Sequence, residues 1–465
     1  MPRAFSARMA EWLGPEFPAF QAALEREYRP GLRVNTLKLA PEEFRQLSPF
    51  PLVPVPWCPE GFVVDDPEAR PGAHPYYYAG LYYPQDPATM AAALLLDPRP
   101  GEWVLDLCAA PGGKASHLAA RMQNTGCLVA NEVHPRRASV LAWNLERLGV
   151  TNALIVNETP RRLASRWAGW FDRVLIDAPC SGEAILARNP GAARYWGPET
   201  VSRCARRELA ILREAAGLVR PGGWLLYATC TFSPEENEGV VSRFLKEHRE
   251  FELVTPALSY PFDRGHPEWL AGALADLERA VRLWPQRGEG HGHFYALLRR
   301  RDGAPPRRKL PPYPSLPEEA RIRYEEFCRE HLAGPPASEG IVEWDGQLYR
   351  SPLPPKAWEG LRVLRPGWWL GRLRKGRFEP NHALAVALRP QAVRRVHDLA
   401  PEEPELRSYL RGQTLKGTGE KGWVLITVAG FPLGWARGEG MGLKSLYPYH
   451  LRATMRDLWN EREGG

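Results

Sequence analysis

Long apolar segments are missing from this chain of 465 residues. A helix needs about 20 mostly apolar residues to cross a bilayer, and no run in the sequence approaches that length. Residues 1–5 also lack the apolar core with which a secretion signal continues. Both absences argue against membrane and secreted proteins, and they predict a cytoplasmic protein without a membrane partner.

Paired cysteines are missing as well. The seven cysteines are scattered and none belongs to a Cys-x-x-Cys pair, so no metal site is expected. An odd number in a chain without a secretion signal also argues against a disulfide framework. Free thiols remain, and a free cysteine is usually a small buried apolar side chain. The seven are Cys58, Cys108, Cys127, Cys180, Cys204, Cys230 and Cys328.

The loop 108–114 lacks two phosphate-binding patterns, G-x-x-x-x-G-K-[ST] and G-x-G-x-x-G. The composition is ordinary for a globular protein, with 44% hydrophobic and 25% charged residues. The formal net charge of +7 suits a polyanionic partner without requiring one. The length predicts several domains. The best boundary candidate is 303–317, GAPPRRKLPPYPSLP, because its prolines exclude regular helix and interior strand.

Strand-like and helix-like segments alternate between residues 100 and 230. The helical segments 135–148 and 204–219 each place apolar residues on one face, and the second stops before the glycines at 222–223. This alternation predicts an α/β fold with a doubly wound, Rossmann-like parallel sheet. Near the end of the chain, 423–428 is strand-like and is followed by turn residues, which predicts a small β-rich module. The five predicted strands are 103–107, 127–131, 153–157, 174–177 and 224–229.

Polar or reactive side chains follow each of these five strands. Because the carboxyl ends of parallel strands meet at one edge of the sheet, where ligands bind, we expect these side chains to share one rim. One polar residue there would mean little, since strand ends are commonly solvated, but a whole row indicates a functional site. The row consists of Asp106, Glu132, Asn157, Asp177 and Cys230.

The first strand runs into a loop of small residues that leads to a helix near Ala115. Small residues let the backbone approach a ligand closely, and the start of a helix offers free N–H groups. An acid such as Glu132, at the end of the next strand, typically binds ribose hydroxyls. A ribose site without a phosphate loop indicates S-adenosylmethionine. The loop consists of Cys108, Ala109, Ala110, Pro111, Gly112, Gly113 and Lys114.

Two cysteines, Cys180 and Cys230, lie on this rim, which favours a chemical role for them. A thiolate that adds to C6 of cytosine turns the ring into an enamine, so that C5 becomes able to attack a methyl sulfonium. Lys114 is a candidate cation for lowering a thiol pKa, and Asp177 is a candidate hydrogen-bond partner for the base edge. The target base must leave its stack to reach such a pocket.

Three motifs on the rim resemble the signatures of the RNA cytosine-5 methyltransferase family, the Nop2/Sun group. They are DLCAAPGGK at 106–114, LIDAPCSGEA at 175–184 and YATCTFSPEENE at 227–238. Any one of them is moderately specific, and the three together are highly specific. The resemblance covers about residues 30–302, including RVNTLK at 33–38 and FYA at 294–296.

The resemblance implies a role for each matched residue. Cys230 corresponds to the cysteine that attacks the base, and Cys180 to the one that assists proton removal or product release. The loop 108–114 corresponds to the cofactor loop, Glu132 to the ribose acid, and Asp177 to the acid of the Asp-Ala-Pro-Cys motif.

One departure concerns the end of the third strand. The family often has an aspartate there that contacts adenine, whereas this chain has Asn157, with Glu158 and Thr159 as rivals for the contact.

The C-terminal third adds two observations. The segments 422–428, 430–435 and 444–452 resemble the PUA-type RNA-binding module of the bacterial small-subunit rRNA methyltransferases of the F type. The segment 361–378 interleaves six Arg and Lys residues with Trp368, Trp369 and Phe378 and contains no acid. Such a pattern suits contacts to phosphates and bases, but a solvated sheet surface over buried tryptophans explains it equally well.

These resemblances predict the division of the chain and its partners. The expected parts are a small α+β RNA-recognition domain at 1–75, a methyltransferase domain at 76–302, a linker and connecting subdomain at 303–375, and a PUA-like RNA-binding domain at 376–465. The expected substrate is small-subunit (16S) rRNA, free or in a ribosomal subunit. The expected cofactor is S-adenosylmethionine without a metal, and a monomer is expected.

Two other functions stay open at this stage. A DNA cytosine-5 methyltransferase would use Cys180 of the Pro-Cys motif as its nucleophile, although the separate Thr-Cys motif and the lack of a large target-recognition insertion argue against it. A non-catalytic ribosome assembly factor could retain the fold, although both cysteines and the full loop argue against such decay.

Overall fold

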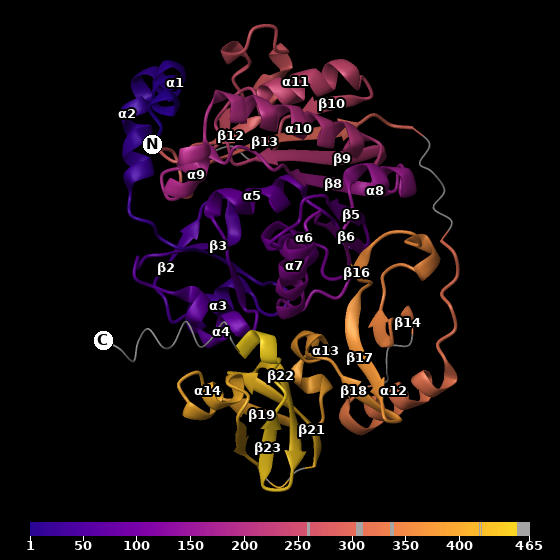
Figure 1. Cartoon of the computed structure of the whole chain (residues 1–465). Helices are drawn as coiled ribbons and strands as arrows, with labels where there is room; N and C mark the ends of the chain where they lie inside the picture. The colour runs from indigo at the N-terminus through magenta and orange to yellow at the C-terminus, as the bar shows by residue number, and fades with distance from the viewer. Residues whose placement is uncertain (258–260, 304–309, 335–338, 418, 420, 453–465) are drawn as a thin grey trace.

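The computed structural model describes residues 1–257, 261–303, 310–334, 339–417, 419 and 421–452. Their strands form four sheets, of which the largest has ten strands and lies at the centre of the molecule (Figure 1). The N-terminal sheet and the two C-terminal sheets pack around it.

The central sheet carries the rim that the sequence predicts. All neighbours in the series β7-β6-β5-β8-β9 are parallel. Because the chain passes from β5 to one side and later returns to its other side, the strand order reverses there, which is where such sheets bind ligands. The doubly wound α/β prediction is confirmed. The strands are β5 (Trp103–Asp106), β6 (Cys127–Asn131), β7 (Ala153–Val156), β8 (Phe171–Asp177) and β9 (Val219–Thr229).

Helices cover both faces of this sheet and bury a separate hydrophobic cluster on each. Adjacent residues of a strand point to opposite faces, so Val104 joins one cluster and Leu105 the other. The first face is covered by α5 (Pro87–Leu96), α6 (Gly113–Arg121) and α7 (Pro135–Arg147). The second is covered by α8 (Pro160–Arg166), α10 (Pro198–Ala216) and α11 (Glu238–Glu247).

The prediction of a helix over 204–219 extends three residues too far. In the structure α10 ends at Ala216, because Val219 already pairs with Phe171 of β8 as the first residue of β9. The turn-like residues Pro221 to Gly223 lie within this long strand, and the N–H of Gly222 donates to the carbonyl of Arg301 at 3.1 Å. The turn residues form an irregularity within the strand, since the register shifts between Phe171 and Arg173 of β8 and Gly222 has a φ of +70°.

Antiparallel strands extend the central sheet at both ends. β13 (His293–Arg300) runs beside β9, and β10 (Phe251–Val254), β12 (Val281–Leu283) and β11 (Asp263–Arg264) continue that side. On the other side, β16 (Val363–Arg365) pairs with β7, so a segment from the C-terminal third completes the methyltransferase sheet.

The N-terminal part has helices before and between the strands of a small antiparallel sheet of order β2-β3-β1-β4. Leu32 and Phe62 of this sheet share one hydrophobic cluster with Leu406 and Ile426 of the C-terminal module, so the N-terminal sheet packs against that module (Figure 1). The elements are α1 (Arg3–Leu13), α2 (Phe17–Glu25), β1 (Gly31–Val34), α3 (Pro41–Leu47), β2 (Leu52–Val55), β3 (Cys58–Val64), α4 (Pro75–Tyr78) and β4 (Tyr82–Pro84).

The C-terminal part is rich in β-structure, as predicted. A four-stranded sheet contains β14 (Ile341–Trp344), β15 (Gln347–Arg350), β17 (Trp368–Arg374) and β18 (Arg377–Pro380), with α12 (Glu318–His331) against it. After α13 (His382–Ala387), a five-stranded sheet contains β19 (Val396–Leu399), β20 (Thr414–Lys416), β21 (Gly422–Val428), β22 (Phe431–Glu439) and β23 (Gly442–Ser445), with α14 (Pro404–Leu410) between its first two strands. The domain bounds given above stay predictions.

Candidate active site

The five polar residues of the predicted row all lie at the carboxyl edge of the central sheet. Asp106 and Asp177 are the last residues of β5 and β8. Glu132, Asn157 and Cys230 each come one residue after the end of their strand. The fold therefore brings together residues that are up to 124 positions apart in the chain.

The loop between β5 and α6 is held from outside by α7. The side chain of Arg137 donates to the carbonyl of Ala110 at 2.9 Å, and Asn144 donates to the carbonyl of Pro111 at 2.8 Å. Gly112 has a φ of +112°, and a Cβ atom there would lie 3.3 Å from side-chain atoms of Leu141 and Asn144. Glycine is therefore required at this position, and the loop backbone is kept close to the rim.

The predicted ribose acid, Glu132, is fixed in a buried position. Its carboxylate accepts a hydrogen bond from the N–H of His134 at 2.9 Å and pairs with Arg137 at 3.2 Å. Asn157 lies against the same segment, because its side-chain amide donates to the carbonyls of Glu132 and Val133 at 2.6 and 2.9 Å. The amide hydrogens of Asn157 are thus used inside the protein, and its amide oxygen remains an acceptor.

The two rivals of Asn157 have other contacts. The Glu158 side chain is buried, accepts from the N–H of Arg362 at 2.9 Å and pairs with Arg162 at 3.1 Å. Thr159 caps α8, since its hydroxyl accepts from the N–H of Arg162. Among the three, Asn157 is the residue best placed to meet a ligand.

Charged groups surround the start of α6. Lys114 donates to Asp177 at 2.7 Å. Although burial opposes it, the positive charge of Lys114 holds the pKa of Asp177 well below its ordinary value. Burial, together with the charge of Asp177, raises the pKa of Asp106 to about 8. Neither carboxylate oxygen of Asp106 has a hydrogen-bond partner among the described residues. A buried carboxyl group of this kind needs a polar partner that the described residues do not supply.

The two candidate cysteines are in contact. Their sulfur atoms lie 3.3 Å apart, and both side chains are partly exposed. The hydrogen bond to Cys230, and then burial, raise the pKa of the Cys180 thiol well above its ordinary value. Cys180 therefore retains its proton and can donate it to the sulfur of Cys230. Four other cysteines are buried, as expected for small apolar side chains: Cys58, Cys127, Cys204 and Cys328.

His293 is a site residue that the sequence reasoning missed. It begins β13, one residue before Phe294, which pairs with Thr229 of β9. Its ring lies 3.6 Å from Asp177, and neither ring nitrogen has a hydrogen-bond partner among the described residues. Burial lowers its pKa, so the ring is neutral near pH 7. Only its position next to the quoted FYA segment could have drawn attention to it.

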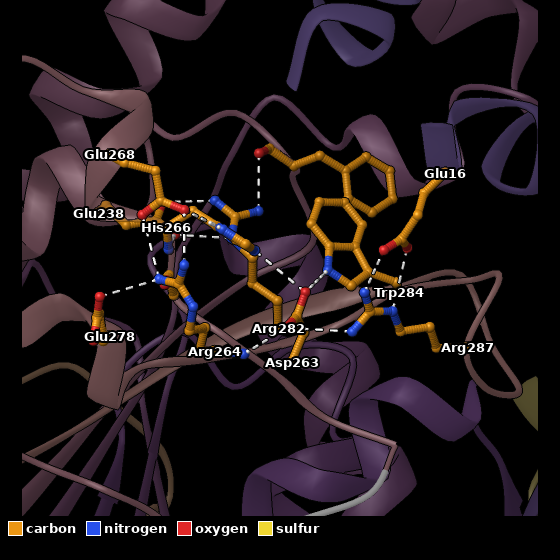
Figure 2. A network of polar contacts seen from close by, with 12 residues as sticks. Glu16, Glu238, Asp263, Arg264, His266, Glu268, Glu278, Arg282, Trp284 and Arg287 are labelled. Atoms are coloured by element: carbon orange, nitrogen blue, oxygen red, sulfur yellow. Dashed lines mark hydrogen bonds and ion pairs between the residues drawn. The ribbon is translucent and has the colours of Figure 1, made fainter. Parts of the chain in front are cut away.

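A buried ion pair anchors the segment that follows Cys230 (Figure 2). Arg282 donates to both carboxylate oxygens of Glu238 at 2.9 and 2.6 Å and to the carbonyl of Phe232 at 3.0 Å. Next to it, Asp263 accepts from the indole N–H of Trp284 and pairs with Arg287, which reaches the N-terminal segment. The segment that follows the nucleophile candidate is thus held by buried polar contacts.

In the basic and aromatic segment 361–378 the tryptophans are packed and two of the arginines are paired with acids. The indole N–H groups of Trp368 and Trp369 donate to Ala383 and Gln347. Arg365 pairs with Glu146 at 2.9 Å, and Arg372 pairs with Glu379 at 3.1 Å. For these residues the structure favours the packing interpretation.

The strand order, the glycine-containing loop after β5 and the acid after β6 define the class of Rossmann-like methyltransferases. Four family models match the chain: 16S rRNA methyltransferase RsmB/F at 93–299, the N-terminal domain of 16S rRNA methyltransferase RsmF at 1–87, the RsmF rRNA methyltransferase first C-terminal domain at 326–388, and the methyltransferase RsmF PUA domain at 396–453. The chain belongs to the 16S rRNA methyltransferase RsmB/F family, whose members use S-adenosylmethionine.

Curated relatives match over nearly the whole chain. The proteins named ribosomal RNA small subunit methyltransferase F from Escherichia coli (strain UMN026) and Escherichia fergusonii are each 32% identical, covering 97% of this chain and 96% of theirs. Among solved structures, a methyltransferase homolog protein from Pyrococcus horikoshii is 29% identical, with a TM-score of 0.57 over 64% of this chain and 95% of its own. NSun6 from the same organism, crystallised with SFG, shares the fold at 22% identity, with a TM-score of 0.54 over 65% of this chain and 99% of its own.

In the part of the chain that the structure describes, no helix combines the length and apolar character needed to cross a membrane.

Proposed function

We propose that this chain methylates C5 of a cytosine in small-subunit (16S) rRNA through a covalent bond between Cys230 and C6 of the base. The observation that carries the proposal is the contact of the two sulfur atoms, 3.3 Å apart, at the rim that also holds Lys114 and Asp177. The names of the relatives support the choice of rRNA.

S-adenosylmethionine fits the residues of this rim. The loop from Cys108 to Gly113 provides a close backbone approach, Glu132 provides an acid for the ribose, and the oxygen of Asn157 provides an acceptor for the adenine amino group. The buried and unpartnered carboxyl group of Asp106 suits a cationic ligand. When bound, this cofactor supplies an electrophilic methyl group.

The chain's own residues then account for the activation of the base. Cys230 loses its proton as its sulfur bonds to C6, the C5–C6 double bond opens, and N3 of the ring takes up a proton. The resulting enamine has enough electron density at C5 to accept a methyl group. Asp177, oriented by Lys114, hydrogen-bonds the base edge and favours protonation of the ring during attack. Loss of the C5 proton then restores the double bond and expels the sulfur of Cys230. Cys180 assists in proton removal or release.

RNA containing 5-fluorocytosine tests the proposal, because fluorine at C5 blocks the final elimination and leaves the protein attached to RNA. We expect an attached product with the unaltered enzyme and with Cys180→Ala, and none with Cys230→Ala. Matched DNA is the control for substrate class. An adduct that survives Cys230→Ala but is lost in Cys180→Ala would favour the DNA-type mechanism. No methyl incorporation into naked 16S rRNA or small subunits would favour an assembly factor.

We further propose that the N-terminal domain and the PUA-like module hold the RNA while the central domain acts, and that the chain acts as a monomer. Their shared hydrophobic cluster supports a fixed orientation of the two RNA-binding parts.

A further inference from the structure

Two buried glutamates connect the loops that carry the two cysteines. Glu236 lies six residues after Cys230 and reaches across to the residue after the other cysteine. Its carboxylate accepts from the backbone N–H of Ser181 at 2.7 Å and from the hydroxyl of Ser181 at 2.5 Å. It also accepts from the hydroxyl of Thr231 at 3.2 Å, so one carboxylate binds the residues that directly follow both cysteines.

Glu183 makes the reverse connection. It lies three residues after Cys180 and accepts from the backbone N–H groups of Phe232 and Ser233, both at 2.8 Å. The hydroxyl of Ser233 donates to it at 2.6 Å. A backbone bond between the same loops, from the N–H of Ala184 to the carbonyl of Cys230 at 3.1 Å, completes the set.

The charge of these glutamates is costly at this depth. Glu183 is 1% exposed and Glu236 is fully buried, and within the described ranges neither carboxylate forms an ion pair with Lys, Arg or His. Glutamine would fill the same space at a lower desolvation cost, but its NH₂ end cannot accept the N–H and O–H donors that meet here. Acceptor-only side chains are thus required on both sides.

The position of Glu236 also affects the two thiols unequally. Burial raises the pKa of Glu236 to about 7, so its carboxylate is mostly ionised at pH 8. This negative charge adds to the hydrogen bond with Cys230 and to burial in raising the pKa of Cys180. Cys180 therefore keeps its proton and can donate it to the sulfur of Cys230, 3.3 Å away.

We propose, on the basis of the function proposed above, that Glu183 and Glu236 are reciprocal positioning residues: they hold the two cysteine loops together so that the sulfurs stay in contact, and they keep the shared proton on Cys180, which leaves Cys230 to attack the base. Glu236 acts mainly on Cys180, and Glu183 acts mainly on the loop of Cys230.

The test uses the full-length variant Glu236→Gln, with Glu235→Gln as its matched control, because Glu235 is the adjacent residue and pairs with Arg8 at the surface. Each protein is treated briefly with iodoacetamide at pH 8, and labelling of the two cysteines is quantified by mass spectrometry of their peptides. We expect Cys230 to be labelled first in the unaltered enzyme and in the control, and labelling to move toward Cys180 in Glu236→Gln. Methylation of rRNA by this variant should lose about 10–100-fold in kcat, with KM changed less than about twofold.

A labelling pattern and kcat like those of the control would overturn the proposal. If Glu236→Gln does not fold, Ser181→Ala tests the positioning part of the proposal, because it removes the 2.5 Å bond to Glu236 and leaves the charge of Glu236 in place. A partial shift of labelling toward Cys180 would support the proposal, and an unchanged pattern would overturn it. The 5-fluorocytosine adduct on Cys230 separates the two failures. Its loss from the unaltered enzyme contradicts the proposed function, whereas an intact adduct with unchanged labelling contradicts only the role of the glutamates.

Discussion

Replacing Arg282 by Met tests the buried support of the Cys230 loop. Arg282 is 2% exposed and Glu238 is fully buried, so the substitution leaves a carboxylate inside the protein without its cation. Breaking a buried pair in this way costs about 3–5 kcal/mol of stability. The carbonyl of Phe232, which Arg282 also satisfies, loses its partner as well.

The double variant Arg282→Met with Glu238→Gln separates the energetic cost of the isolated charge from the cost of the lost hydrogen bond to the Phe232 carbonyl. Glutamine keeps an oxygen for the N–H of His266, which donates to Glu238 at 2.9 Å, but it carries no charge. The remaining cost is that of the unsatisfied Phe232 carbonyl, about 1–3 kcal/mol, so the double variant should be about 2 kcal/mol more stable than the single one.

Urea unfolding followed by far-UV circular dichroism measures both free energies. Glu238→Gln alone serves as the reference for the loss of the carboxylate. A double variant that is no more stable than Arg282→Met would refute the reasoning, because it would show that the isolated charge is not what destabilises the single variant.

Three further predictions concern the rim and its surroundings. Lys114→Met removes the cation 2.7 Å from Asp177, so the pKa of Asp177 should rise and the acidic limb of the kcat/KM profile should move to higher pH. The value of kcat/KM should fall by about 10–150-fold, and an unchanged profile would contradict this. Gly112→Ala should lower the free energy of unfolding by about 1–3 kcal/mol and weaken cofactor binding measured by calorimetry, because its φ is +112°; unaltered affinity would count against the loop assignment. Burial and Glu236 raise the pKa of Glu208 from 4.5 to about 10, so the stability that its protonation contributes is full below pH 4.5 and is lost as pH rises toward 10. Between pH 6 and pH 8 the unaltered protein should thus lose about 3 kcal/mol more than Glu208→Gln, and equal losses in urea unfolding would refute this.

Much of the rim could be predicted because it depends on a general property of parallel sheets. The carboxyl ends of the strands meet at one edge, so a polar residue after each apolar run identifies the site without any knowledge of its shape. This reasoning reached Asp106, Glu132, Asn157, Asp177 and Cys230, which the structure places together.

Interactions between distant segments could not be predicted in the same way. Whether Asn157 or Glu158 faces a ligand depends on Arg362, which arrives about 200 residues later on the segment that includes β16. In the sequence the segment 361–378 contains no acid, and its arginines suggest contacts with RNA. In the folded chain Arg365 and Arg372 form ion pairs with Glu146 and Glu379. His293 could not be predicted for the same reason, since Asp177, which lies 3.6 Å from its ring, is on another strand.

The sequence by itself determined the fold class and the candidate catalytic and cofactor-binding residues. The spacing of apolar residues, the ends of the strands and the three motifs are local properties of the chain. The tertiary structure decided the distance between the two sulfurs, the burial of Glu183 and Glu236 and the pairing of the arginines. These are properties of contacts between segments far apart in the chain, and their energies depend on burial and on distances of a few ångströms that no local pattern records.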